Sequence, residues 1–135
     1  MRKTVLSFVG ALALIGFAAS SGNAKPALKD VPQITEGLIA TGIAYEISRV
    51  CDDIDARTLR GINFLWGLKQ TARDMGYTEA EIDAFVDDKA EKAALEAEAR
   101  KRLVEMGAVG GNTASYCAVG QAEIARQSAV GQLLR

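Results

Sequence analysis

Apolar side chains recur at three- and four-residue steps through most of the chain, which is the spacing of one face of an α-helix. The first such stretch predicts a helix over roughly 32–51. Asp30 is a candidate cap for this helix. Pro32 is tolerated in the first turn because the amide there has no helical partner. Gly37 and Gly42 lie inside the predicted helix, where they would let a neighbouring helix approach closely.

Three further helices are predicted downstream by the same spacing. The second covers 59–75, and the third covers 78–106. The third opens with a capping box, in which Thr78 is the cap and Glu81 reaches back to it. A fourth covers about 113–125, after a glycine-rich break. No alternating run is long enough for a sheet, so we expect an all-α fold, a small bundle of about four helices.

Two groups of apolar residues lead to different expectations about burial. Trp66, Phe64 and Phe85 should fill the core with the aliphatic stripes, because such residues at helical spacing are usually buried. The C-terminal tail either closes the core or remains available to a partner. Three of its residues form the candidate partner contact: Val130, Leu133 and Leu134.

Residues 1–24 have the three-part pattern of a removable export signal. Two basic residues precede an apolar stretch over 5–19, and small residues lead to a predicted cut between Ala24 and Lys25. An uncleaved membrane anchor is the alternative. However, 15 residues at about 1.5 Å each are too short for a hydrocarbon core of about 30 Å. We therefore expect a single soluble, periplasmic domain over 25–135.

Cys51 and Cys117 are the only cysteines, and an even count in a short exported chain favours a disulfide. The bond would close a loop of 66 residues and join the end of the first helix to the start of the fourth. A redox-active pair is the alternative. Such pairs usually lie close together as CxxC with a lowered thiolate pKa, and these two are far apart in sequence. A structural disulfide is therefore the prediction.

Composition excludes several classes of function. The chain has no histidine, which rules out serine–histidine triads, histidine-bound zinc and c-type haem attachment. Its net charge of −1 becomes −3 when the two basic leader residues are removed, so no basic surplus points to nucleic acid. We expect no catalytic residues, no cofactor and no metal, and a membrane connection only through the signal sequence or a membrane-bound partner.

Weaker candidate sites each have a simpler explanation. Asp52, Asp53 and Asp55 offer oxygens to calcium, but the EF-hand spacing is absent and helix capping accounts for them. Four arginines would bind an anion if they converged, but their spacing does not place all of them on one face. They are Arg49, Arg57, Arg60 and Arg73. Snorkelling and surface pairing are the ordinary explanation.

Two segments, from Cys51 to Asp88 and from Ser115 to Arg135, resemble a family of small exported bacterial proteins described only as a domain of unknown function. The resemblance extends over nearly all of the mature chain and includes both cysteines and the closing GQLLR. It implies no activity and no catalytic residue. Members of this family are sometimes encoded beside subunits of the respiratory NADH dehydrogenase. The resemblance therefore implies an accessory role in the cell envelope.

Three functions fit these observations. The first is a non-enzymatic interaction or accessory module with a protein partner, associated with a membrane respiratory complex. The second is a periplasmic chaperone that opens under acid stress. Without histidine, its switch would rest on carboxylates titrating near pH 4. The third is a ligand- or lipid-binding bundle in which Trp66, Phe64 and Tyr45 line a cavity. Partner identity and oligomeric state stay open.

Overall fold

The structure, a computed structural model, describes residues 24–135. The predicted leader lies outside the described residues except for Ala24, which is exposed, as is Lys25. The described chain contains helices and isolated β-bridges but no strand, which confirms the all-α fold class. Its elements are η1 (Leu28–Asp30), α1 (Pro32–Val50), α2 (Thr58–Asp74), α3 (Glu79–Asp87), α4 (Lys89–Glu105), α5 (Thr113–Ala125) and η2 (Gly131–Leu133). No helix in this part of the chain is both long and apolar enough to span a membrane.

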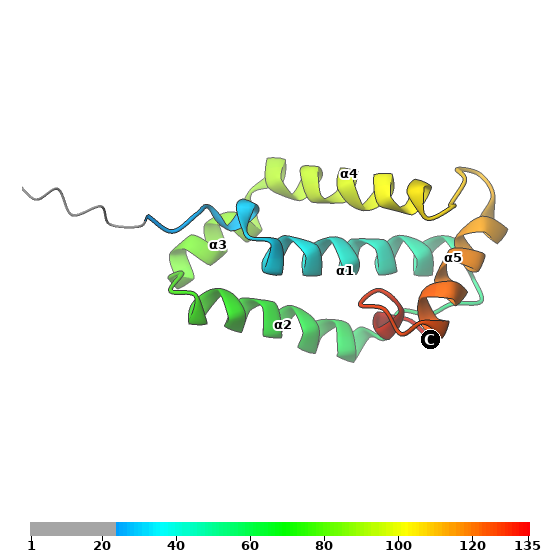
Figure 1. The fold of residues 1–135 in the computed structure, drawn as a ribbon, viewed down its shortest axis with the longest axis horizontal. Coiled ribbons are helices and arrows are strands. Elements are labelled where there is room, and N and C mark those ends of the chain that lie inside the picture. Colours follow the sequence, from blue (N-terminus) through cyan, green and yellow to red (C-terminus); the bar gives the residue numbers. More distant parts are fainter. Residues whose placement is uncertain (1–23) are drawn as a thin grey trace, which may run out of the picture.

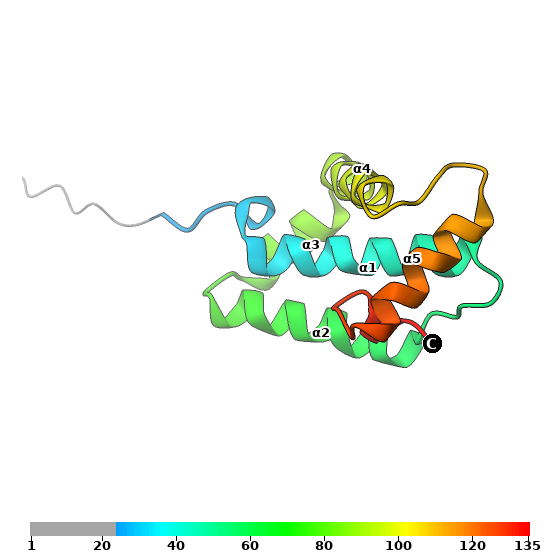
Figure 2. The ribbon, with the colours of Figure 1, turned by 45° about the vertical axis from the view of Figure 1, so that its right-hand side comes forward.

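Helix α1 is the central element, with α4 along one side and α2 along the other (Figure 1). The short helix α3 joins α2 to α4 at one end of the molecule, and α5 packs on α1 at the other. The chain then returns through η2 to the start of α2, where it ends (Figures 1 and 2). Helix α2 is therefore covered mainly by α1, α3 and the tail, and the rest of its circumference is free.

The predicted third helix is two helices, so the bundle has five α-helices in its described part and not four. The break lies at Asp88, whose backbone leaves the helical conformation with ψ of 110°. Its carboxylate accepts hydrogen bonds from the amides of Ala90 and Glu91, at 2.8 and 3.0 Å. Aspartate is among the best N-cap residues, and here its capping preference ends α3 and begins α4.

The capping box at α3 is confirmed. The Glu81 carboxylate accepts from the Thr78 amide at 2.7 Å, and the Thr78 hydroxyl accepts from the Glu81 amide at 3.2 Å. The predicted cap on the first helix is wrong. Asp30 lies in η1, and α1 follows Val31, which makes no side-chain cap. Pro32, which needs no amide partner at a helix start, is the first residue of α1.

Isoleucines of α1 form the centre of the main core, where Ile47 is fully buried. They pack with Leu103 of α4 and Val119 of α5. A smaller cluster lies at the α3 end around Ile34, Ala72, Tyr77 and Ile82. Glycine permits the close helix contact predicted at Gly42, because a Cβ there would lie 3.2 Å from the Cβ of Ala99 in α4.

The C-terminal tail belongs to the core, which is the first of the two alternatives that the sequence left open. Val130, Leu133 and Leu134 are only 6%, 5% and 2% exposed. The loop before α2 holds the tail in place. The backbone of the tail pairs with this loop, since the Arg57 amide donates to the Leu133 carbonyl at 2.8 Å and Asp55 exchanges hydrogen bonds with Arg135. Partner contact through these three side chains would require the tail to leave the core.

The predicted disulfide is confirmed. Cys51 directly follows α1 and Cys117 lies in α5, with their Cα atoms 5.2 Å apart. Cys51 is completely buried in the main core. The bond therefore joins the end of the central helix to the helix that crosses it.

Gly67 gives a first prediction, because it lies mid-helix in α2 and a Cβ there would meet no atom within 4 Å. Gly67→Ala should raise the free energy of unfolding by about 1 kcal/mol, since alanine loses less backbone entropy in a helix. Urea unfolding of the two proteins measures the difference. Gly37→Ala is the matched control and should be destabilising, because its Cβ would lie 2.7 Å from the Leu68 side chain. A loss of stability in Gly67→Ala would mean that this side of α2 is packed.

Candidate functional site

Helix α2 presents an exposed apolar face, where burial was predicted. Trp66 is 60% exposed and Leu59 is 78% exposed, and Ile62 and Leu65 are also exposed. Phe64 is half-buried against the main core. Periodicity showed that α2 is apolar over much of its circumference, but it cannot show which part a neighbour covers. The helix packs through residues such as Leu68 and Ala72, and the Trp66 side is left uncovered.

This face forms one wall of a groove of about 580 Å³, which we call the α2 groove. Its apolar lining comes from four helices, so it exists only in the folded chain. The residues that define it are Leu38 of α1, Ile62, Leu65 and Trp66 of α2, and Phe85 and Val86 of α3, with Leu95 of α4. Val86 is 64% exposed, so the wall opposite Trp66 is also open to solvent.

Charged side chains of both signs border the α2 groove. Lys69 lies 2.8 Å from Glu79 and 3.7 Å from Asp83, which ties α2 to α3, and its ammonium lies 5.9 Å from the Trp66 ring centroid. Arg73 and then Lys69, both hydrogen-bonded to Glu79, lower the pKa of that carboxyl to about 2. These bridges thus persist in moderate acid. Lys92 also lines the groove and makes no ion pair with any described residue.

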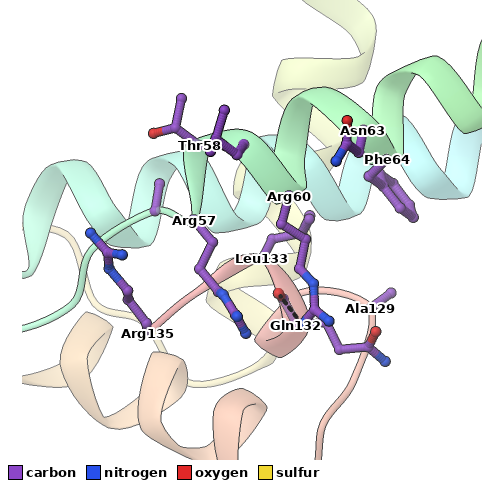
Figure 3. Close-up of a pocket in the computed structure, with 11 residues that line it drawn as sticks. Arg57, Thr58, Arg60, Asn63, Phe64, Ala129, Gln132, Leu133 and Arg135 are labelled. Carbon is purple, nitrogen blue, oxygen red and sulfur yellow. Dashed lines mark hydrogen bonds between the residues drawn. The ribbon is translucent and has the colours of Figure 1, made fainter.

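A second surface, which we call the arginine pocket, lies at the other end of α2. It has a volume of about 900 Å³ and lies between the start of α2 and the C-terminal tail (Figure 3). Its defining side chains are Arg57, Arg60, Asn63, Gln132 and Arg135, with Phe64 and Leu133 as apolar neighbours. Figure 3 shows Arg57 and Arg60 extending from the start of α2 toward the tail, with Arg135 on the Arg57 side.

Two of the four arginines singled out in the sequence come together in this pocket. Arg57 and Arg60 line it, whereas Arg49 pairs with Glu46 at 2.8 Å and Arg73 pairs with Glu79. Sequence reasoning missed Arg135. Its place depends on the pairing of the tail with the loop before α2, and no local pattern in the sequence indicates that pairing.

The expectation that Asp52, Asp53 and Asp55 are helix caps is wrong, because α2 begins after Arg57 with no side-chain cap. Asp52, Asp53 and Asp55 are exposed in the loop after α1, and residues 24–135 contain no group of three side chains placed to hold a metal ion. The hydroxyls of Ser115 and Ser128 make hydrogen bonds with groups no more than six residues away. What the described residues offer is therefore two binding surfaces, one apolar and one basic.

Comparison with known proteins assigns the chain at the level of family. No curated protein and no solved structure matches it. A family model described as "Family of unknown function (DUF5333)" matches residues 26–135, and the chain therefore belongs to that family.

Proposed function

We propose that this protein is an exported, non-enzymatic interaction module that binds an amphipathic helix of a partner protein in the α2 groove. The observation that carries the proposal is the uncovered apolar face of α2 around Trp66. Burial of apolar surface drives folding and association alike, so a contiguous exposed patch on a small domain marks a contact site. The same face is not needed to complete the core, which lies on the other side of α1 and along the tail.

The shape of the α2 groove favours a helix over a small molecule. Small-ligand sites bury most of the ligand surface, roughly 70–90% of it. Here both walls stay open, with Trp66 60% and Val86 64% exposed. An open apolar channel of this kind suits the apolar positions of an amphipathic helix, spaced by three and four residues. Lys92 at the border offers an ionic partner to an acidic residue of that helix.

The disulfide supports a location outside the cytoplasm, because such bonds form and persist in oxidising compartments. With the predicted export signal, the proposed location is the periplasm. There the partner would be a membrane-bound or membrane-associated protein, and the resemblance noted above makes a respiratory complex the first place to look for it.

Site-specific crosslinking in intact cell envelopes tests this function. A photo-crosslinking residue at position 62, in the groove, should capture one partner, and the crosslinked peptide should have apolar residues at helical spacing. The same residue at position 104 is the control, because Val104 is 65% exposed and lies outside the groove. Equal capture from both positions, or no capture from position 62, would contradict the proposal.

Fluorescence gives an independent test, because Trp66 is the only tryptophan in the chain. The synthetic peptide identified by crosslinking should shift the Trp66 emission to shorter wavelength as the groove is covered. Ile62→Asp should weaken binding of that peptide at least tenfold, since a charge in a desolvated contact is costly. Val104→Asp should bind like the original protein. An unshifted emission at saturating peptide would count against binding in the groove.

The acid-activated chaperone is less well supported by the charges. An acid switch needs carboxylates that titrate near pH 4. The pKa of Glu79 is about 2, and hydrogen bonds from Arg102 of α4 lower the pKa of Glu36 in α1. Both carboxylates bridge helix pairs, Glu79 stays ionised at pH 4, and the contact with Arg102 favours the ionised form of Glu36. A broad set of captured clients that grows under acid stress would nevertheless favour the chaperone.

A further inference from the structure

We propose that the arginine pocket binds a phosphate group, presented either by a lipid headgroup or by a soluble phosphate. This site lies at the opposite end of α2 from the groove and does not depend on the function proposed above. Its three cationic side chains are Arg57, Arg60 and Arg135. Guanidinium groups match the oxygens of a phosphate with paired hydrogen bonds, which makes arginine the usual residue for such recognition.

The guanidinium groups of this pocket make no ion pair with an acidic side chain of the described chain. The lining contains no aspartate or glutamate, and among residues 24–135 no ion pair involves Arg57, Arg60 or Arg135. Of the described arginines outside the pocket, Arg49, Arg73, Arg102 and Arg126 pair with glutamates, and Arg100 makes no ion pair. Surface cations are ordinarily mixed with acidic neighbours. The guanidinium groups of Arg57 and Arg60, which lie in one hollow without an acidic side chain, therefore point to an anion supplied from outside.

The backbone at the start of α2 adds to the positive electrostatic potential of the arginine pocket. Helix α2 begins after Arg57 with no side-chain cap and no acidic residue in its first turn. Its first free amides and the positive end of its dipole therefore favour an anion. Thr78, Asp88 and Asn112 cap α3, α4 and α5, whereas α1, like α2, has no side-chain cap. The start of α2 keeps its donors free beside two arginines.

Hydrogen bonds of the tail with the loop before α2 and with the start of α2 position the three arginines along the chain. Arg60 donates from Nη1 to the Gln132 carbonyl at 3.3 Å, which leaves its other guanidinium nitrogens free for a ligand. The backbone of Arg57 is held by the Leu133 carbonyl at 2.8 Å, and that of Arg135 by Asp55 at 3.0 Å. The buried tail thus positions the pocket. Leu59, 78% exposed at its edge, is an apolar neighbour that a membrane lipid would cover.

The test measures binding of two probes to the full mature chain. Inorganic phosphate is titrated by calorimetry, and cosedimentation is measured with vesicles of phosphatidylglycerol in phosphatidylcholine. The double variant Arg57→Gln/Arg60→Gln should bind about a hundredfold more weakly, or about tenfold for each arginine. Arg100→Gln is the control for the loss of one surface charge, because Arg100 is exposed and outside the pocket, and it should bind like the original protein. Circular dichroism checks that each variant is folded.

Each outcome decides the proposal. Phosphate binding that the double variant loses assigns a soluble phosphate, and vesicle binding lost in the same way without phosphate binding assigns a lipid headgroup. If neither probe binds, or if Arg100→Gln loses as much as the double variant, the pocket is not a phosphate site. Ile62→Asp in the α2 groove should leave both titrations unchanged, so failure of one proposal is distinguishable from failure of the other.

Discussion

Replacing Cys51 and Cys117 together by serine should lower the free energy of unfolding by about 4 kcal/mol. The bond closes a loop of 66 residues, and the chain-entropy model assigns that amount to the freedom which the unfolded chain regains without it. A domain of this size is typically stable by about 5–15 kcal/mol, so the loss is a large share of the total. Urea unfolding of the oxidised protein and of the double variant measures it.

The original protein under reducing conditions is the matched control for this experiment. Its unfolding curve should approach that of the double variant, and reductant should leave the double variant unchanged. A loss below about 1 kcal/mol would contradict a stabilising disulfide and would reopen the redox alternative. Cys51 is fully buried, which favours the structural role, because a redox-active cysteine has to be reached by its partner.

Features set by short stretches of sequence were predictable. Thr78 and Glu81 form the capping box because both partners lie within four residues. The all-helical class followed from spacing, and the disulfide followed from a pair of cysteines that had no other partner. The glycine at position 42 was predictable for a similar reason, because a missing side chain inside an amphipathic helix indicates a close neighbour.

Features set by competition between segments were not predictable. Asp88 lies in an alanine-rich, charged stretch that reads as continuous helix, yet its carboxylate is used better as a cap on α4 than in a helix interior. Because charged residues and alanines continue on both sides of Asp88, no local pattern indicated the break. The Asp88 carboxylate bonds to backbone amides, and Lys92, one turn later, lines the α2 groove.

The arginine pocket comes from the folding of the tail onto the chain near α2, which the sequence left open as one of two alternatives. The tail residues Leu133 and Leu134 are buried in the main core, whereas Trp66 in the α2 groove stays exposed. The same return of the chain brings Arg135 beside Arg57. Periodicity reports which residues are apolar, but only the tertiary arrangement decides which of two apolar groups is buried.

Leu134→Ala tests whether the tail is part of the core, and it should lower the free energy of unfolding by about 3 kcal/mol. The side chain is 2% exposed within the main core, and its removal costs the buried apolar surface together with the cavity left behind. Leu59→Ala is the matched control, since the same atoms are removed where the leucine is 78% exposed, and it should change stability by less than about 0.5 kcal/mol. Thermal and urea unfolding of both variants give the comparison. If Leu134→Ala were as mild as Leu59→Ala, the tail would be free for a partner after all, and the arginine pocket would lose the support that places Arg135.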